Sequence, residues 1–284
     1  MAELKTPARG RLAWAVALPA EAKPIIAHLS LKRSQNHGPF PVYHSACGEH
    51  ALVVSGVGRN RMSAAVVHLY HVLGQPAYLA WLNVGIAGHK DSPLGSAFMI
   101  SQAKEASSGA TFYPHWVFDS PLPMKTLCTV DAPQRQMQND ALYDMEGTAF
   151  FDTASRLSCA ELVACVKLVS DHGDIDQAFP KRQQIGAWID AAMDNLDEVA
   201  KKLLSLSAEE VHRVVGIDLQ AYLDRHHFSV TQRHQLSACL RRWRALGLTS
   251  DPLAIVSESE SGKAAIRALE TALNTVEIQW GKRP

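Results

Sequence analysis

Short apolar runs alternate with helical patterns over about the first 200 residues of the 284-residue chain. Nearly continuous apolar runs of this length predict strands that are buried on both faces of a sheet. The predicted strands cover residues 11–18, 51–58, 77–84, 97–102, 125–130, 141–145 and 164–170. Apolar residues at helical spacing predict helices over 19–29, 61–73 and 148–157. The pattern therefore predicts an α/β fold, a central sheet flanked by helices.

From about residue 181 the strands stop and only helical patterns remain. Residues 185–206 are predicted to form one long amphipathic helix. Ser207 is the expected N-cap of the next helix, because acidic residues follow it in what would be the first turn. Further helices are predicted over 231–246 and 261–273. The expected organisation is an α/β domain over 11–204 and an all-helical C-terminal extension over 205–284.

Composition and charge exclude several classes of protein. Apolar residues make up 47% and charged residues 20% of the chain, which is typical of globular proteins rather than disordered ones. The 28 basic residues balance the 28 acidic ones, so no overall charge attracts nucleic acid or anionic lipid. No apolar run approaches the roughly 18–20 residues that cross a bilayer. The five cysteines are scattered without a CxxC pair, as in a cytoplasmic protein with reduced thiols, and we expect no membrane partner.

Polar residues that could carry chemistry follow three of the predicted strands. Glu21 comes after the first strand, Glu146 after the sixth and Asp171 after the seventh. Two glycine-rich turns, at 55–58 and 83–88, follow two other strands. Sites in α/β sheets form beyond the carboxyl ends of the strands, so these segments are candidates for one shared site.

Five of these segments, taken in order, resemble motifs of the nucleoside phosphorylase/nucleosidase superfamily, and within it the methylthioadenosine/S-adenosylhomocysteine nucleosidases. They are ALPAEA at 17–22, SGVG at 55–58, NVGIAGH at 83–89, DMEG at 144–147 and SD at 170–171. The resemblance covers roughly residues 11–200 and leaves the C-terminal helices unexplained. It implies that the central sheet is mixed, that the protein forms a homo-oligomer and that no cofactor is needed.

The resemblance also implies a role for each matching residue. Asp171 would be the general acid at N7 of a purine, with Ser170 holding it, and Glu21 would be the base that activates water. Glu146 would accept hydrogen bonds from the ribose hydroxyls while Met145 packs on the sugar. The implied substrate-binding residues are Glu146, Met145, Ser170, Gly85, Ile86 and Gly88. Cleavage of an N-glycosidic bond passes through an oxocarbenium-like state, which needs an acid on the leaving group and a carboxylate near water.

The expected function is therefore hydrolysis of the N-glycosidic bond of a purine nucleoside. Val84 and Ile86 stand where the family has threonine and serine, which removes hydroxyls that could bind phosphate. Two alternatives stay open: a phosphate-dependent purine nucleoside phosphorylase, with Arg59 or Arg61 in its anion pocket, and a nucleoside-binding protein without turnover. The sequence leaves the purine and the 5′ substituent of the ribose undefined.

Each candidate also has a purely structural interpretation. Glu21 could be a first-turn acid favoured by the helix dipole, and Asp171 could be an N-cap. Asp144 is interpreted mainly as a solvated charge at a strand end. His68 and His71 are one helical turn apart without a third ligand, so no metal site is expected.

The C-terminal extension contains a basic stretch. Between residues 225 and 250 there are five arginines, three histidines, Trp243 and no acidic residue. A solvated helix face is the more common meaning of such a stretch. Binding of nucleic acid is the alternative.

Overall fold

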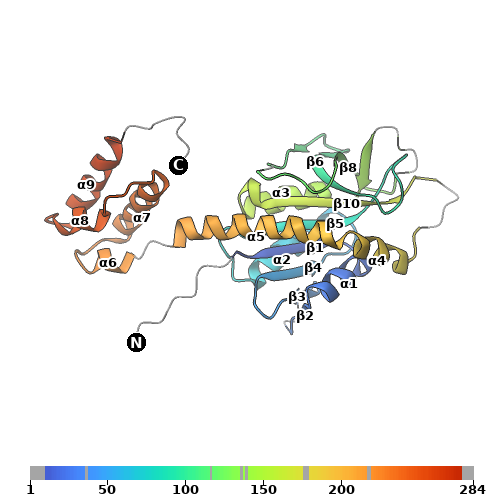
Figure 1. The fold of residues 1–284 in the computed structure, drawn as a ribbon, viewed down its shortest axis with the longest axis horizontal. Coiled ribbons are helices and arrows are strands. Elements are labelled where there is room, and N and C mark those ends of the chain that lie inside the picture. The colour runs from blue at the N-terminus through green and yellow to red at the C-terminus, as the bar shows by residue number, and fades with distance from the viewer. Residues whose placement is uncertain are drawn as a thin grey trace. The chain divides into compact units, whose positions relative to one another are not determined.

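The computed structural model describes residues 10–35, 38–115, 117–134, 137, 140–174, 179–215 and 219–276 (Figure 1). The chain divides into two compact units, Met1–Glu209 and Glu210–Pro284. We call them the sheet unit and the helical unit. Helix α5 (Met193–Val215) begins in the first and ends in the second.

The described residues of the sheet unit form one mixed ten-stranded sheet. Its strands are β1 (Leu12–Val16), β2 (Lys32–Arg33), β3 (Val42–His44), β4 (His50–Val54), β5 (Ala80–Gly88), β6 (Ala97–Glu105), β7 (Thr111–Phe112), β8 (Met124–Thr129), β9 (Ala141–Asp144) and β10 (Val163–Asp171). Strands β4, β1, β5 and β10 run parallel, whereas β9 is antiparallel to β5 and β6 is antiparallel to β10. The order is β10-β6-β8-β9-β5-β1-β4-β3-β2, and β10 also pairs with β5. Five strands therefore close into a ring: β5, β10, β6, β8 and β9. The ends of β5, β9 and β10 meet at the rim of this ring.

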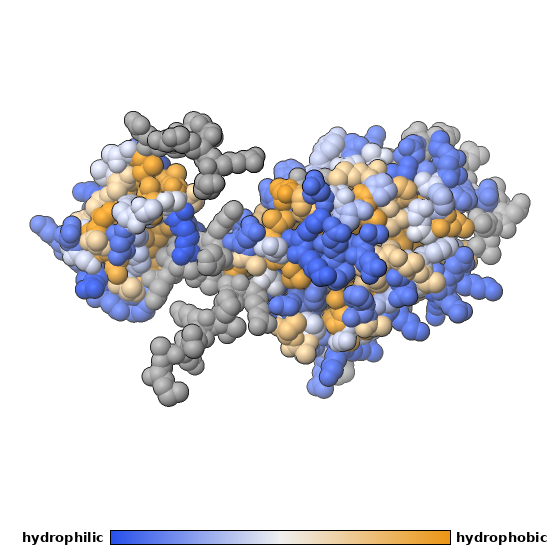
Figure 2. Space-filling model, viewed as in Figure 1, coloured by the Kyte–Doolittle hydropathy of each residue, from blue (hydrophilic) through white to orange (hydrophobic). Residues whose placement is uncertain are grey.

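Helices cover both faces of the sheet because alternate residues of the central strands point to opposite sides. Leu12 and Trp14 of β1 belong to the apolar cluster that includes residues of α1 (Pro19–His28), α4 (Arg182–Ala191) and α5. Ala13 and Ala15 belong to the cluster on the other face, which includes α2 (Arg59–Val72) and α3 (Gly147–Leu157). The outward side of α5 carries ion pairs such as Lys201–Asp197 and forms the hydrophilic surface over this helix in Figure 2.

The predicted fold class is confirmed, since each predicted strand overlaps an observed one and the sheet is mixed. Periodicity did not reveal the short strands β2, β3 and β7, which contain only two or three residues each. The segment 83–88 is not a turn but the second half of β5, because β10 pairs with it as far as Gly88.

The predicted single helix over 185–206 is wrong, because the chain breaks at Ala192 between α4 and α5. Ser207 is not an N-cap either, since it lies inside α5. Its buried hydroxyl accepts a hydrogen bond from the Arg11 backbone N–H (3.1 Å) and donates one to the Tyr78 carbonyl (2.8 Å). The Ser207 hydroxyl therefore makes tertiary hydrogen bonds instead of capping a helix as its local sequence predicts.

The helical unit contains α6 (Leu219–Leu223), α7 (Val230–Ala245), α8 (Pro252–Ser257) and α9 (Gly262–Asn274). Ser229, Asp251 and Ser261 cap α7, α8 and α9 by accepting backbone N–H bonds. The predicted helices over 231–246 and 261–273 correspond to α7 and α9. In the basic stretch, Arg233 donates to the Phe228 carbonyl and Arg242 to the Asn274 side chain, so both serve the unit itself. None of the described helices is long and apolar enough to cross a membrane.

Candidate functional site

A cavity of about 290 Å³ opens at the ends of β1, β5, β9 and β10. It is lined by seven of the eight residues selected from the sequence: Glu21, Ile86, Gly88, Met145, Glu146, Ser170 and Asp171. The eighth, Gly85, lies beneath it in β5. The structure thus brings residues that are up to 150 positions apart in sequence to one place, because the strands that precede them are neighbours in the sheet.

Glu21 is buried in the first turn of α1, with only 1% of its surface exposed. Its Oε2 accepts the backbone N–H groups of Ala17 (2.9 Å) and Leu18 (2.8 Å), and Oε1 accepts that of Ile86 (2.9 Å). Burial raises its pKa, although these N–H bonds and the charge of Lys167 act in the opposite direction. Glu21 therefore both caps α1, as the structural interpretation holds, and presents a fixed carboxyl to the cavity.

A buried ion pair supports this end of the site. Lys167 Nζ lies 2.9 Å from Asp144 Oδ2, and both side chains are at least 98% buried. Burial acts to lower the pKa of Lys167, but the attraction of Asp144 and the neighbouring Cys165 and Glu146 outweighs it, so the pKa is raised. Lys167 is therefore an ammonium ion inside the protein.

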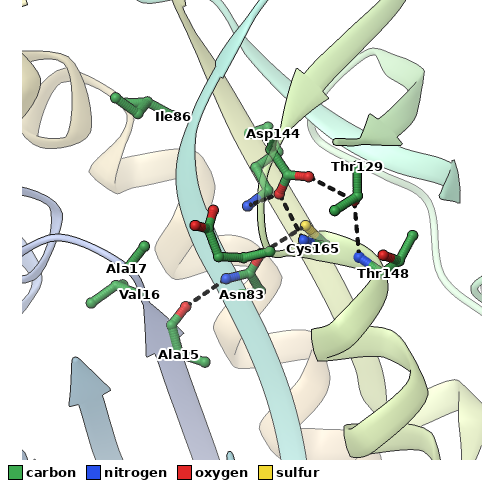
Figure 3. A network of polar contacts seen from close by, with 12 residues as sticks. Ala15, Val16, Ala17, Asn83, Ile86, Thr129, Asp144, Thr148 and Cys165 are labelled. Atoms are coloured by element: carbon green, nitrogen blue, oxygen red, sulfur yellow. Dashed lines mark hydrogen bonds and ion pairs between the residues drawn. The ribbon is translucent and has the colours of Figure 1, made fainter. Parts of the chain in front are cut away.

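Asp144 is the centre of a polar network (Figure 3). Its Oδ1 accepts the Thr129 hydroxyl (2.7 Å) and its Oδ2 accepts the Gly147 backbone N–H (2.8 Å). The Thr129 hydroxyl oxygen in turn accepts the N–H of Thr148 (3.0 Å). The interpretation of Asp144 as a solvated charge is wrong, because the start of α3 and Lys167 enclose it.

Gly85 explains how the ion pair and Glu21 come together. A Cβ atom at this position would lie 3.2 Å from Glu21 Oε1 and 3.2 Å from Lys167 Nζ. The missing side chain therefore leaves the space in which the two charged groups approach each other. Lys167 is not among the residues predicted from the sequence, although a lysine in the middle of the apolar strand VACVKLVSD is a usable signal.

Glu146 is the N-cap residue of α3 and is 7% exposed. Its Oε1 accepts the backbone N–H of Gly58 at 2.6 Å. Gly58 has φ +107°, a conformation that side chains rarely allow, so glycine is needed to turn its N–H toward this carboxylate. Burial, followed by the nearby charge of Asp144, raises the pKa of Glu146 to about 7.

Asp171 is the last residue of β10 rather than a helix N-cap. Its Oδ2 accepts the hydroxyl of Ser170 (2.7 Å) and its Oδ1 accepts the N–H of Gly173 (3.0 Å). A Cβ at Gly88 would lie 3.0 Å from Asp171 Oδ1, so this glycine allows the carboxylate to approach β5. Ser170 and Gly173 fix the orientation of the acid at the cavity.

The rest of the cavity wall is mainly apolar and could cover a flat ring. Val57, Met137, Tyr143 and Phe179 belong to this wall, and Gln134 adds an amide. The site can therefore transfer protons to and from an organic ligand through its three carboxyl groups, beside one buried ammonium ion. The apolar wall would contact the uncharged part of that ligand. Among the described residues, no group of His, Cys, Asp and Glu is arranged to hold a metal ion.

Several solved structures that are similar to this chain are nucleosidases. The chain is similar to the 5′-methylthioadenosine nucleosidase of Arabidopsis thaliana (TM-score 0.54, 19% identity, 70% of this chain and 96% of that chain). It is also similar to a variant MTA/SAH nucleosidase of Chlamydia trachomatis bound to MTA (0.52, 23%, 67% and 98%). A third is the MTA/SAH nucleosidase of Colwellia psychrerythraea in complex with adenine (0.54, 15%, 69% and 95%). No protein-family model and no curated protein matches the sequence.

The sheet unit therefore has the nucleoside phosphorylase fold. Within that fold, its structural likeness is to the MTA/SAH nucleosidases, at low sequence identity.

Proposed function

We propose that the protein hydrolyses the N-glycosidic bond of a purine nucleoside. The observation that carries this proposal is the convergence of Glu21, Glu146 and Asp171 on one cavity. Proteins of the same fold have been solved with MTA and with adenine bound, which supports a purine nucleoside as the ligand.

Asp171 is the general acid in this proposal. It protonates N7 of the purine as the bond between C1′ and N9 breaks, and the bonding electron pair leaves with the base. Ser170 and Gly173 keep the carboxyl in one orientation, as a proton donor requires. The sugar passes through an oxocarbenium-like state.

Glu21 is the general base. It takes a proton from a water molecule while the water oxygen bonds to C1′, and the proton returns to Asp171 through solvent. Of the three backbone N–H groups that bind the Glu21 carboxylate, only that of Ile86 donates to Oε1. Oε1 therefore retains a lone pair for water. The raised pKa of Glu21 brings its basicity closer to that required for proton transfer near neutral pH.

Glu146 and Met145 hold the sugar. One oxygen of Glu146 accepts the Gly58 N–H, which leaves the other for the ribose hydroxyls. Phosphorolysis has less support. Arg59 is already paired with Glu105 and Asp131, and the side chain at position 86 is an isoleucine without a hydroxyl.

The test is chromatographic detection of released base. The protein is incubated with adenosine, inosine, methylthioadenosine and adenosylhomocysteine, with and without phosphate. We expect base release without phosphate, and a loss of about 10²- to 10⁴-fold in kcat in Asp171→Asn. Asp152→Asn, on the exposed side of α3, is the matched control and should retain full activity.

Other results would contradict the proposal. Release that requires phosphate would make the protein a phosphorylase. Binding of a nucleoside without release, at high protein concentration, would make it a binding protein without turnover.

A further inference from the structure

Helix α7 presents a basic surface to solvent. Its buried side packs into the core of the helical unit through Leu236, Leu240 and Trp243. Its exposed residues include four basic ones that lie along one side: Arg233, His234, Arg241 and Arg244. Residues 233 and 244 are about three helical turns apart and residues 234 and 241 about two, so these side chains follow one another along the helix. We call these four residues the basic stripe.

No acidic residue of α7 neutralises the basic stripe, because the chain has none between residues 225 and 250. Arg241 forms no side-chain hydrogen bond or ion pair with any residue that the structure describes. Arg233 donates to the Phe228 carbonyl through Nε (3.1 Å), which leaves its two terminal nitrogens available. The guanidinium groups of Arg233 and Arg241 can therefore bind an external anion. The acidic residues described in the helical unit all lie outside α7: Glu210, Asp224, Asp251, Glu258, Glu260 and Glu270.

Other surface helices of the protein neutralise their own charges. Arg156 pairs with Asp152 on α3 at 2.8 Å, and Lys201 pairs with Asp197 on α5 at 2.7 Å. In both pairs the acid lies one helical turn from the base, a spacing that stabilises an isolated helix. Helix α7 lacks acids at every spacing, so its arginines repel one another unless an anion from outside lies between them.

Double-stranded DNA suits this stripe better than other nucleic acids. The major groove of B-DNA, about 12 Å wide, admits an α-helix, whereas the major groove of an A-form RNA helix is too narrow for side chains to read. Proteins that bind single strands stack the bases on aromatic rings. In the described part of the helical unit, Phe228 and Trp243 are buried and Tyr222 packs against the core, so no Phe, Tyr or Trp there forms an open platform for bases.

An anionic membrane is a less suitable partner. A helix that lies on a membrane buries an apolar face between the lipids. The apolar face of α7 is already buried in the core of the helical unit. Val230 is the one large apolar side chain that is exposed among the described residues of this unit.

We propose that the basic stripe of α7 binds the phosphate backbone of double-stranded DNA. Guanidinium ions pair with phosphate oxygens through parallel N–H groups, and such contacts hold a protein on DNA without reading its sequence. The stripe spans roughly 16 Å along the helix, which is long enough to meet several phosphates. This binding does not depend on the nucleosidase activity proposed for the sheet unit.

The test measures binding of the full chain to a labelled duplex of mixed sequence by fluorescence anisotropy. We expect a Kd of about 10⁻⁶ to 10⁻⁴ M at physiological salt, and a Kd that rises steeply with salt concentration. Arg241→Gln should reduce the slope of log K against log salt by about 1, and the double variant Arg233→Gln/Arg241→Gln should weaken binding about tenfold or more. Arg241→Lys keeps the charge and should retain most of the affinity.

Arg156→Gln is the matched control, because it removes the same charge from an exposed arginine of α3 that already has a partner. It should bind the duplex as the wild type does. Glutamine favours a helix almost as well as arginine, so thermal unfolding of the α7 variants should be unchanged and weaker binding cannot be due to unfolding.

Three results would overturn the inference. The first is an absence of duplex binding by the wild type at low salt. The second is equal affinity of the wild type and Arg233→Gln/Arg241→Gln. The third is binding to single-stranded DNA, double-stranded RNA or vesicles with anionic lipid that is as tight as binding to the duplex. Release of base from nucleosides is measured separately, so failure of the nucleosidase proposal leaves this result unaffected.

Discussion

The two units of the protein bury different kinds of side chain. Every buried polar or charged residue of the described chain lies in the sheet unit, among them Glu21, Asp144, Glu146 and Lys167. The buried residues of the helical unit, such as Leu236, are apolar apart from the thiol of Cys239.

This difference indicates that buried side chains serve stability in the helical unit and chemistry in the sheet unit. An apolar core is stabilised by packing and by removal of surface from water. A buried ion loses its hydration, and its attraction to a partner only partly offsets that loss. The charges of the sheet unit gather around one cavity, so they are better explained by what the cavity does than by what they add to stability.

The largest expected effect comes from breaking the buried ion pair. Lys167→Met leaves Asp144 charged and unpaired inside the protein, so we expect the free energy of unfolding to fall by about 3–5 kcal/mol. The double variant with Asp144→Leu should lose less than the sum of the single changes. Urea denaturation measures both. Lys201→Met, which removes an ion pair on α5 whose lysine is exposed, is the control, and an equal loss there would refute the distinction.

A change in the core of the helical unit should affect stability alone. Leu269 is fully buried in α9, and Leu269→Ala should destabilise that unit by about 2–5 kcal/mol through the cavity it leaves. Hydrogen exchange of the full chain should show lower protection in α7 and α9 only. Base release should stay at the wild-type rate, and a parallel loss of activity would show that the chemistry depends on this unit.

The pH dependence of stability tests the burial of Glu146. Its folded pKa of about 7 lies above the ordinary 4.5, so its stabilising contribution is complete below pH 4.5 and is lost as the pH rises through 7. In the wild type, the free energy of unfolding should therefore fall by up to about 3 kcal/mol between pH 4.5 and 7 because of Glu146. In Glu146→Gln this fall should be absent. Parallel stability curves for the variant and the wild type, from pH 4.5 to 8, would contradict the raised pKa.

The smallest effect is expected on the surface of the sheet unit. Arg156 pairs with Asp152 one helical turn away, at 2.8 Å, and both side chains are exposed. Arg156→Gln should change the free energy of unfolding by about 0.5 kcal/mol or less. A change of several kcal/mol in thermal or urea unfolding would show that exposure is a poor guide to the energy of charges here.

Much of the fold could be predicted from local pattern. The apolar runs located the seven longer strands because each contains buried apolar residues, and helical spacing located α2, α3, α7 and α9. No proline or glycine marks the break at Ala192, so the helical periodicity predicted a single helix over 185–206. Ser207 looked like a cap because its hydroxyl suits one, and only the contact with Arg11 and Tyr78 shows its actual use.

For the candidate site, the order of the residues along the chain indicated which ones line the cavity. It did not indicate which charged side chains pair with each other. Their positions after strands made Glu21, Glu146 and Asp171 candidates, and the resemblance to the nucleosidases selected them. Lys167 was passed over because a lone lysine in a strand gives no sign of which carboxylate it meets. Asp144 was assigned to solvent for the same reason.

The sequence by itself determined the element types and the residues that stand at strand ends, because period and apolar content are local properties of the chain. Only the tertiary structure decided which of those ends meet, that Lys167 pairs with Asp144, that Gly85 leaves room for both charges, and that Glu146 has a pKa of about 7. Electrostatic energy and burial depend on distances between atoms that are far apart in sequence, and the pairing of β5 with β9 and β10 sets those distances.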